Sequence, residues 1–441
     1  MKKLLPLLLI LVLLLSACSN GSGAAPAAQG EEQPAETQQE KLDHTIITLD
    51  GANAEIRGGG ARDEGGVIAI SAAGTYELSG VSSEMALVVD TGDDPMDVTL
   101  ILNNAQITNP TGPAIHVKQA KHFRLRLADG SENLLASGQE ADLQNPDPQA
   151  SGAALFSEDD MDIEGEGSLT VCGYLNNGIG CKNDLDINSG NIAVLAANNG
   201  VRGNDSVQIK GGVLAVSAWG DGIKATASNK EGKGYVEISG GSVSLEVWGD
   251  GVQAATELRV TGGSLKVIAR GDGVEHSSKA LKAEKLIQIS DGSLSLSALE
   301  DGIRCSAGNV DVSGGSIQIA VAGDGILAGE KGSGLGDVTV SGGELSISAG
   351  SQAVKARGSF SVSGGSIRAL CGSEKQVAPQ GSPCLLCLIS GAQGDPVQLG
   401  ELGSVEAPQS YKCLLLVLPE LSPGQTVTAS NRVGSVDATV K

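Results

Sequence analysis

Aromatic side chains are scarce in this chain: two Trp, four Tyr and three Phe make up 2% of its 441 residues. Basic residues are also few, with 30 Lys and Arg against 52 Asp and Glu and a net charge of −22. Because phosphate backbones bind to basic surfaces, this balance excludes nucleic acid from the expected partners. It also means that an anionic ligand would need a bridging cation.

Long apolar runs are missing as well, with one exception at the N-terminus. After two lysines, the segment from Leu4 to Leu15 is almost wholly apolar, and small residues follow it. This segment is too short to remain across a bilayer and has the pattern of a signal peptide. The later apolar run from Leu414 to Leu418 is far too short to span a membrane.

The apolar segment ends in Leu15-Ser16-Ala17-Cys18, which resembles the lipobox of bacterial lipoproteins. The resemblance implies that residues 1–18 hold a signal peptide and the lipobox, and that Cys18 becomes the acylated first residue of the mature chain. The alternative is an ordinary cleaved signal with an accidental Cys. Residues 19–42 are mostly Gly, Ala, Pro, Gln, Glu and Ser, which cannot bury enough apolar surface to fold. The sequence therefore predicts an extracytoplasmic protein that a disordered linker tethers to the membrane through lipid.

A disulfide framework is also lacking. Besides Cys18 there are seven Cys, an odd number with irregular spacing. Cys384 and Cys387 form a lone C-x-x-C pair in an apolar stretch, for which zinc or redox use competes with buried thiols or one local disulfide. The four His are scattered, and the sequence contains no Ser-His-Asp arrangement, phosphate loop or helical zinc motif.

What the chain has in abundance is glycine, with 63 residues, and a repeat built on it. A Gly that follows Asn or Asp and precedes Ile or Val recurs every 22 to 29 residues, and a Gly-Gly pair recurs between these motifs. Each pair is followed by a short alternating stretch such as 213–218, whose period of two indicates a β-strand. The aligned glycines are Gly178, Gly200, Gly222, Gly251, Gly273, Gly302 and Gly325.

A unit of this length, with short strands and tight glycine corners, is one coil of a β-solenoid. Each coil buries its apolar face only when a neighbour stacks on it at about 4.8 Å. The sequence therefore predicts an all-β, right-handed parallel β-helix over residues 43–370. The repeat is lost over 371–441, which we expect to form a cap. The extra residues of two longer coils, Thr226–Lys233 and Ser277–Glu284, are expected to project from one edge as a rim.

Stacked coils place equivalent residues in columns, and one predicted column is acidic. Five carboxylates about 5 Å apart repel one another by about 1 kcal/mol per adjacent pair. Ca²⁺ would relieve this repulsion, because it takes oxygen ligands of this kind. The alternative is that Asp-Gly is good turn chemistry and that the column is solvated. The column consists of Asn177, Asn199, Asp221, Asp250, Asp272, Asp301 and Asp324.

Two further acidic sets are alternative calcium sites. One precedes a strand in three early coils, and its members keep nearly the same register. The other is a short cluster closer to the N-terminus. The first set is Asp159, Asp160, Asp184 and Asp205, and the second is Asp93, Asp94 and Asp97.

The two Trp are well placed for a ligand. Trp219 and Trp248 each lie two residues before a column Asp, and alternation turns them outward. They should therefore stand one above the other on adjacent coils, with Arg270 next in line. Flat indoles can stack on sugar rings, and Arg270 or Lys224 could pair with a uronate. The competing interpretation is two rings packed over a loop.

The chain resembles the bacterial carbohydrate-binding β-helix lipoproteins whose fold is similar to that of pectate lyases. The resemblance lies in segments 74–80, 93–100, 159–160 and 183–184, and in the Gly-Asp-Gly-Ile coils. It implies non-catalytic binding of plant-type polysaccharides, including acidic ones such as polygalacturonate, at the cell surface with bound Ca²⁺. The chain departs from the pattern by placing Asn at 177, 183 and 199, which puts metal binding in those coils in doubt.

Two other functions compete with this interpretation. One is a calcium-dependent polysaccharide lyase, for which Lys224 is the best candidate base because it follows Asp221 by three residues. However, one Lys near an Asp is usually an ion pair. The other is an adhesin or structural stalk without small ligands.

Overall fold

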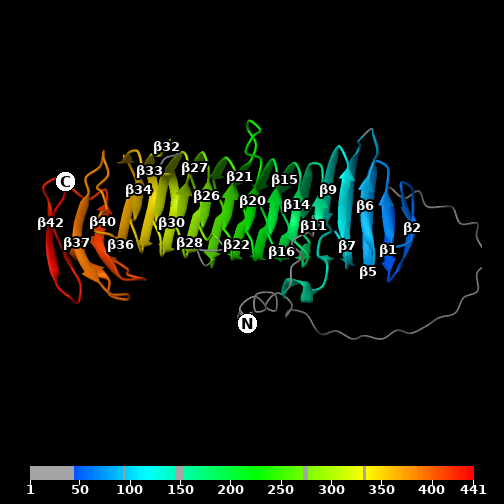
Figure 1. Ribbon diagram of the computed structural model, residues 1–441, viewed down its shortest axis with the longest axis horizontal. Helices are drawn as coiled ribbons and strands as arrows, with labels where there is room; N and C mark the ends of the chain where they lie inside the picture. Colours follow the sequence, from blue (N-terminus) through cyan, green and yellow to red (C-terminus); the bar gives the residue numbers. More distant parts are fainter. Residues whose placement is uncertain (1–43, 94, 145–151, 272–276, 331–333) are drawn as a thin grey trace, which may run out of the picture.

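The structure is a computed structural model that describes residues 44–93, 95–144, 152–271, 277–330 and 334–441. These residues form β-strands and two short 3-10 helices, η1 (Glu140–Gln144) and η2 (Gly400–Leu402). The strands wind into an elongated β-solenoid of about 11 turns (Figure 1), so the predicted all-β solenoid is confirmed. Cys18 and its apolar segment lie outside the described residues. Within the described ranges, no helix is long and apolar enough to cross a membrane.

Most coils contain three strands, which stack in parallel on the strands of the next coil. The first strand of each coil is short and belongs to a sheet that we call sheet I. Sheet I contains β3 (Ala61–Asp63), β4 (Val67–Ile70), β6 (Ala86–Asp90), β8 (Ile115–Gln119), β11 (Ala153–Ser157), β14 (Asn177–Cys181), β17 (Val201–Gly203), β20 (Ile223–Ala225), β23 (Val252–Ala254), β26 (Leu281–Ala283), β29 (Ile303–Cys305), β31 (Ile326–Glu330), β32 (Gly334–Leu335) and β34 (Val354–Ala356).

The second and third strands of each coil form two more faces, sheets II and III. Sheet II contains β9 (His122–Leu127), β12 (Met161–Gly165), β15 (Asp184–Ile187), β18 (Ser206–Ile209), β21 (Tyr235–Ile238), β24 (Glu257–Val260), β27 (Leu286–Ile289) and β35 (Phe360–Val362). Sheet III contains β10 (Glu132–Ser137), β13 (Ser168–Gly173), β16 (Asn191–Ala196), β19 (Val213–Ala218), β22 (Ser242–Val247), β25 (Ser264–Ala269), β28 (Ser293–Ala298) and β36 (Ser366–Cys371). Four long strands run through both faces: β5 (Gly74–Ser82), β7 (Asp97–Asn109), β30 (Asn309–Val321) and β33 (Val338–Ala349).

The core is a set of apolar columns between the three faces. Alternating residues point inward, and each stacks on its equivalent in the next coil. Burying one aliphatic side chain in this way contributes about 1.5–3 kcal/mol. The inward column of sheet I is fully buried and consists of Ile179, Val201, Ile223, Val252, Leu281, Ile303, Ile326 and Val354.

The Gly-Gly pairs form the corner between sheets II and III. Gly241, the second of its pair, has a φ of +77°, a conformation that L side chains rarely adopt. A Cβ added there would lie 2.7 Å from the carbonyl oxygen of Gly212 in the preceding coil. The corner therefore needs glycine both for its backbone conformation and for the close stacking of coils.

The structure corrects one step of the expected repeat. Val252 pairs with Leu281, so Lys279 stands on Asp250 in the column that was expected to hold Asp272. Asp272 itself lies outside the described residues. The Asp-Gly-Val motif at 272–274 misled the alignment, because the inward apolar residue that continues the core is Leu281.

The expected rim is also wrong. The loop 226–234 lies between sheet I and sheet II and projects from the body, as the green loop in Figure 1 shows. Segment 277–284, by contrast, contains strand β26, which continues sheet I in regular register. The extra residues of that coil follow strand β25 of sheet III and precede β26. The two insertions therefore leave from different corners.

Both ends of the described solenoid are covered by antiparallel strands. At the N-terminal end, β1 (Thr45–Asp50) pairs with β2 (Asn53–Arg57) on one side and β5 on the other. At the C-terminal end, β40 (Tyr411–Val417) pairs with β36 and with β37 (Leu385–Gly391). A small sheet with its own apolar cluster completes the cap and contains β38 (Val397–Gln398), β39 (Ser404–Val405), β41 (Thr426–Ser430) and β42 (Ser435–Thr439).

Candidate functional site

The indoles of Trp219 and Trp248 stack on each other at the corner that follows sheet III. Their ring centroids are 4.7 Å apart with an interplanar angle of 38°. The amides of Trp219, Trp248 and Arg270 donate to the carbonyls of successive coils, so these residues occupy consecutive corner positions as expected. Both Trp are partly buried, and the indole N–H of Trp219 has no hydrogen-bond partner within the described structure. We call this pair the indole shelf.

The cations expected beside the indole shelf already hold carboxylates. Arg270 contacts Glu246 of β22 through Nε at 2.9 Å and Nη2 at 2.8 Å. Lys224 donates to Asp221 at 2.7 Å, and its side chain is 28% exposed. Both side chains are thus engaged in ion pairs within the chain, and their pairing with a uronate stays a prediction.

The acidic column is buried rather than solvated, and its carboxylates join one coil to the next. Asp221, Asp250, Asp301 and Asp324 are at most 8% exposed. In each of them, Oδ1 accepts the backbone N–H of the following coil's column residue, at 2.7 to 3.0 Å. Asn177 and Asn199 accept the corresponding amide in the two earlier coils. The column thus supplies acceptors that the corner backbone needs.

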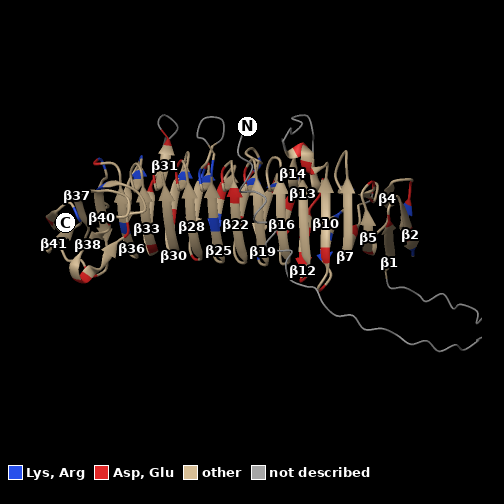
Figure 2. Ribbon diagram, turned by 90° about the horizontal axis from the view of Figure 1, so that it is seen from below, with Lys and Arg blue, Asp and Glu red and all other residues tan. Residues whose placement is uncertain are grey.

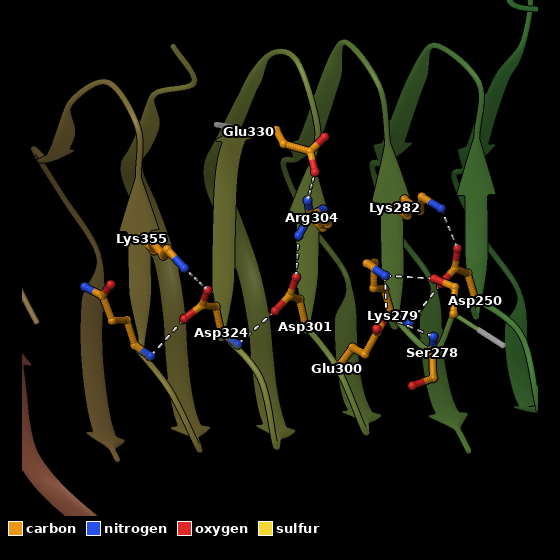
Figure 3. A network of polar contacts seen from close by, with 12 residues as sticks. Asp250, Ser278, Lys279, Lys282, Glu300, Asp301, Arg304, Asp324, Glu330 and Lys355 are labelled. Atoms are coloured by element: carbon orange, nitrogen blue, oxygen red, sulfur yellow. Dashed lines mark hydrogen bonds and ion pairs between the residues drawn. The ribbon is translucent and has the colours of Figure 1, made fainter. Parts of the chain in front are cut away.

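The second oxygen of each column Asp binds a cation. The outward column of sheet I provides these cations, which are Lys224, Lys282, Arg304 and Lys355, at 2.7 to 3.0 Å from Oδ2. Figure 3 shows the last three of them. We call this column, together with Arg202 of β17, the cation ladder. Its charges neutralise the repulsion from which calcium was inferred, and basic and acidic positions are accordingly interspersed along the body (Figure 2).

A groove lies between the cation ladder and the corner that continues the indole shelf. It has a volume of about 650 Å³ and is lined by Lys282 and Arg304 on one side and by Leu299 and Glu300 on the other. Leu299 is 56% exposed, and Lys279 at the floor pairs with Glu300 (Figure 3). Charged side chains of both signs, with Leu299 and Ala322, therefore line a surface suited to a polar, uncharged or weakly charged chain.

Two carboxylates of the earlier acidic set, Asp184 and Asp205, are also neutralised, by lysines of the loop 226–234. Lys230 contacts Asp205 at 2.9 Å, and Lys233 contacts Asp184 at 2.7 Å. The hydrogen bond that Lys233 donates to Asp184 is the main cause that raises the pKa of Lys233. Asp159 accepts the amide of Ala120, while Asp160 accepts that of Asp184.

In this arrangement the described column carboxylates and those of Asp184 and Asp205 do not fit a Ca²⁺ ion, because groups of the chain itself already engage them. Both oxygens of each described column Asp are engaged, and ammonium groups stand beside Asp184 and Asp205. Within the ranges that the structure describes, no group of three or more His, Cys, Asp or Glu converges on a point that could hold a metal. Asp94 and Asp272 lie outside those ranges. Calcium binding stays a prediction.

The seven cysteines that the structure describes are all buried and free. Cys384 and Cys387 lie in the cap, where burial raises the pKa of the Cys387 thiol to about 11. This agrees with buried thiols, one of the alternatives for the C-x-x-C pair.

Sequence reasoning missed two residues of sheet I that face solvent beside the column. Phe156 and Arg202 line a second groove of about 590 Å³. The spacing held a signal for Arg202: a cation also follows Asp221 and Asp301 by three residues, whereas Arg202 follows Asn199. Phe156 had no such signal, because its coil does not carry the Asn/Asp-Gly-Ile/Val motif.

Comparison with known proteins bears on what this surface does. A family described as carbohydrate-binding domain-containing protein matches residues 64–325 and 306–383, which is more than half of the chain. The chain belongs to this family. Its member from Acetivibrio thermocellus, also described as a carbohydrate-binding domain-containing protein, is 36% identical over 129 residues. That match covers 29% of this chain and 45% of the relative, so less than half of the relative's length is spanned.

A solved structure of a polysaccharide lyase-like protein from C. thermocellum, in a gadolinium derivative, is also similar to this carbohydrate-binding-domain family member. The identity is 29%, the TM-score is 0.45, and the match covers 66% of this chain and 99% of that one.

Proposed function

We propose that this protein binds polysaccharide without cleaving it, with the indole shelf as the surface on which sugar rings stack. The observation that carries the proposal is the contact between Trp219 and Trp248, two outward rings on consecutive coils of a carbohydrate-binding-domain family member. Aromatic rings offer flat apolar faces and bury a large area in a contact, so two neighbouring indoles can support the apolar faces of sugar rings. The coil spacing of about 4.8 Å is close to the length of one sugar unit, so a chain can follow the solenoid axis.

The groove beside the cation ladder extends this surface toward the C-terminus. Its ion-paired side chains, among them Lys282, Arg304 and Glu300, offer hydrogen-bond donors and acceptors to hydroxyl groups. We propose that its ligands are plant cell-wall polymers, both neutral ones and polygalacturonate. We also propose that the protein acts at the cell surface through a lipid on Cys18, and the lipobox-like sequence supports this.

The test is binding of purified protein to neutral and acidic polysaccharides by affinity electrophoresis and calorimetry. Trp219→Ala and Trp248→Ala should each weaken binding at least tenfold, about 1.4 kcal/mol, because buried Trp anchors dominate such interfaces. Tyr235→Ala is the matched control, since Tyr235 is an outward aromatic residue of sheet II. Equal binding by all four proteins would refute the role of the indole shelf. Binding to no glycan would favour the stalk.

The lyase alternative is tested in the same experiment. Its candidate base, Lys224, is hydrogen-bonded to the buried Asp221, which is the ion pair that the spacing also predicted. We therefore propose no catalytic step. The appearance of ultraviolet absorbance from unsaturated sugar ends, with polygalacturonate and Ca²⁺, would overturn this conclusion.

A further inference from the structure

Three register partners on the outer surface of sheet I form a slot. Phe156 of β11 pairs with Gly180 of β14, and Gly180 pairs with Arg202 of β17. Since neighbouring strands are about 4.8 Å apart, a ring and a guanidinium flank one position that has no side chain. We call this the Phe156–Arg202 slot. The groove that contains it is also lined by Lys182 and Asn183.

The ring of Phe156 is held in place. His116 lies 5.3 Å from it on one side, and the Lys182 ammonium lies 5.8 Å from its centroid. Glu158 accepts from both His116 and Lys182, which fixes these neighbours. A Cβ at Gly180 would come within 3.2 Å of the ring, so glycine keeps both the ring position and the space beside it.

Arg202 is the exception in the cation ladder. It is exposed, and the described part of the chain gives it no hydrogen-bond or ion-pair partner. Lys224 and Arg304 each bind an Asp three residues earlier, but the corresponding residue for Arg202 is Asn199. The side chain of Asn199 is neutral, and it bonds to Asn177 and to the amide of Asp221. The guanidinium therefore keeps an uncompensated charge in a chain whose net charge is −22.

We propose that the Phe156–Arg202 slot binds one uronate residue of an acidic polysaccharide. The apolar face of the sugar ring lies against Phe156, and the carboxylate takes a charge-assisted hydrogen bond from Arg202. The inference rests on the proposed function and deepens it. It adds a subsite separate from the indole shelf, and it needs no bridging cation.

The structure offers an isosteric test. Asn199→Asp places a carboxylate three residues before Arg202, as in the pairs Asp221–Lys224 and Asp301–Arg304. The new carboxylate should form an ion pair with the Arg202 guanidinium, which is then no longer available to a ligand. Asn191→Asp is the matched control, because it makes the same change at an exposed position of β16, outside the residues that line the groove. Arg202→Gln and Phe156→Ala remove the two walls of the slot directly. Circular dichroism and thermal unfolding establish that each variant is folded.

The probe is trigalacturonate, compared with a neutral trisaccharide, by calorimetry at low and high salt. Asn199→Asp, Arg202→Gln and Phe156→Ala should weaken trigalacturonate binding about tenfold, while Asn191→Asp stays within twofold of wild type. Arg202→Gln should also reduce the salt dependence. Unchanged affinity in Asn199→Asp and Arg202→Gln, or an equal loss in Asn191→Asp, would overturn the slot. Wild-type binding to neutral glycans alone would overturn it while leaving the proposed function, whereas binding to no saccharide would overturn both.

Discussion

Removing the carboxylate of Asp250 should separate two roles of the acidic column, which are to accept backbone amides and to pair with cations. Its side chain is 1% exposed, and Oδ1 accepts the amide of Lys279 at 2.9 Å and the hydroxyl of Ser277 at 2.6 Å. Oδ2 accepts from Lys282 at 3.0 Å. Asp250→Ala leaves the buried amide without an acceptor, at about 1–3 kcal/mol, and leaves Lys282 without its partner.

Lys282 is 27% exposed, so water partly replaces the ion pair that its ammonium group loses in this variant. We expect a total of about 2–4 kcal/mol for Asp250→Ala. Asp250→Asn is the control, because Asn177 and Asn199 accept the same kind of coil-to-coil amide in earlier coils. It should lose only the ion pair, at about 1 kcal/mol.

The assay is hydrogen exchange followed by mass spectrometry, since long repeat arrays do not unfold in two states and local opening is the relevant quantity. Peptides that contain Lys279 should exchange much faster in Asp250→Ala and only slightly faster in Asp250→Asn. Peptides of the cap serve as the internal reference. Equal exchange in the two variants, or no change in Asp250→Ala, would refute the role of the column as a backbone acceptor.

Two further expectations concern ions and lipid. Wild-type protein should show no calorimetric heat from Ca²⁺ at the Asp184–Asp205 series, whereas the double variant Lys230→Met/Lys233→Met should gain calcium-dependent thermal stability, because it unmasks these carboxylates. Stoichiometric calcium binding by wild type that is lost in Asp184→Asn would show that the ion displaces the lysines. Fatty-acid labelling of cells that express the full chain should mark wild type but not Cys18→Ala, and label on both would exclude Cys18 as the acylated residue.

Sequence reasoning reached the architecture because the repeat is local. Every coil carries the alternation and the Gly-Gly corner, as in 209–218, and such a unit can bury its apolar face only under another copy. The stacking of Trp219 on Trp248 followed from the same period, since the coils that contain them are in register. These features depend on spacing alone.

The tertiary structure decided which side chains share a column once coil lengths differ. An insertion can leave from either corner, and only the pairing of Leu281 under Val252 shows that Lys279, not Asp272, follows Asp250. The tertiary structure also decided which charged side chains pair. Lys230 and Lys233 contact Asp205 and Asp184, which are 25 and 49 residues away in the sequence. Arg202, by contrast, has no partner in the described chain. The period of the repeat determines the backbone register between coils of equal length. The ion pairs of flexible side chains depend on distances that exist only once the coils have folded.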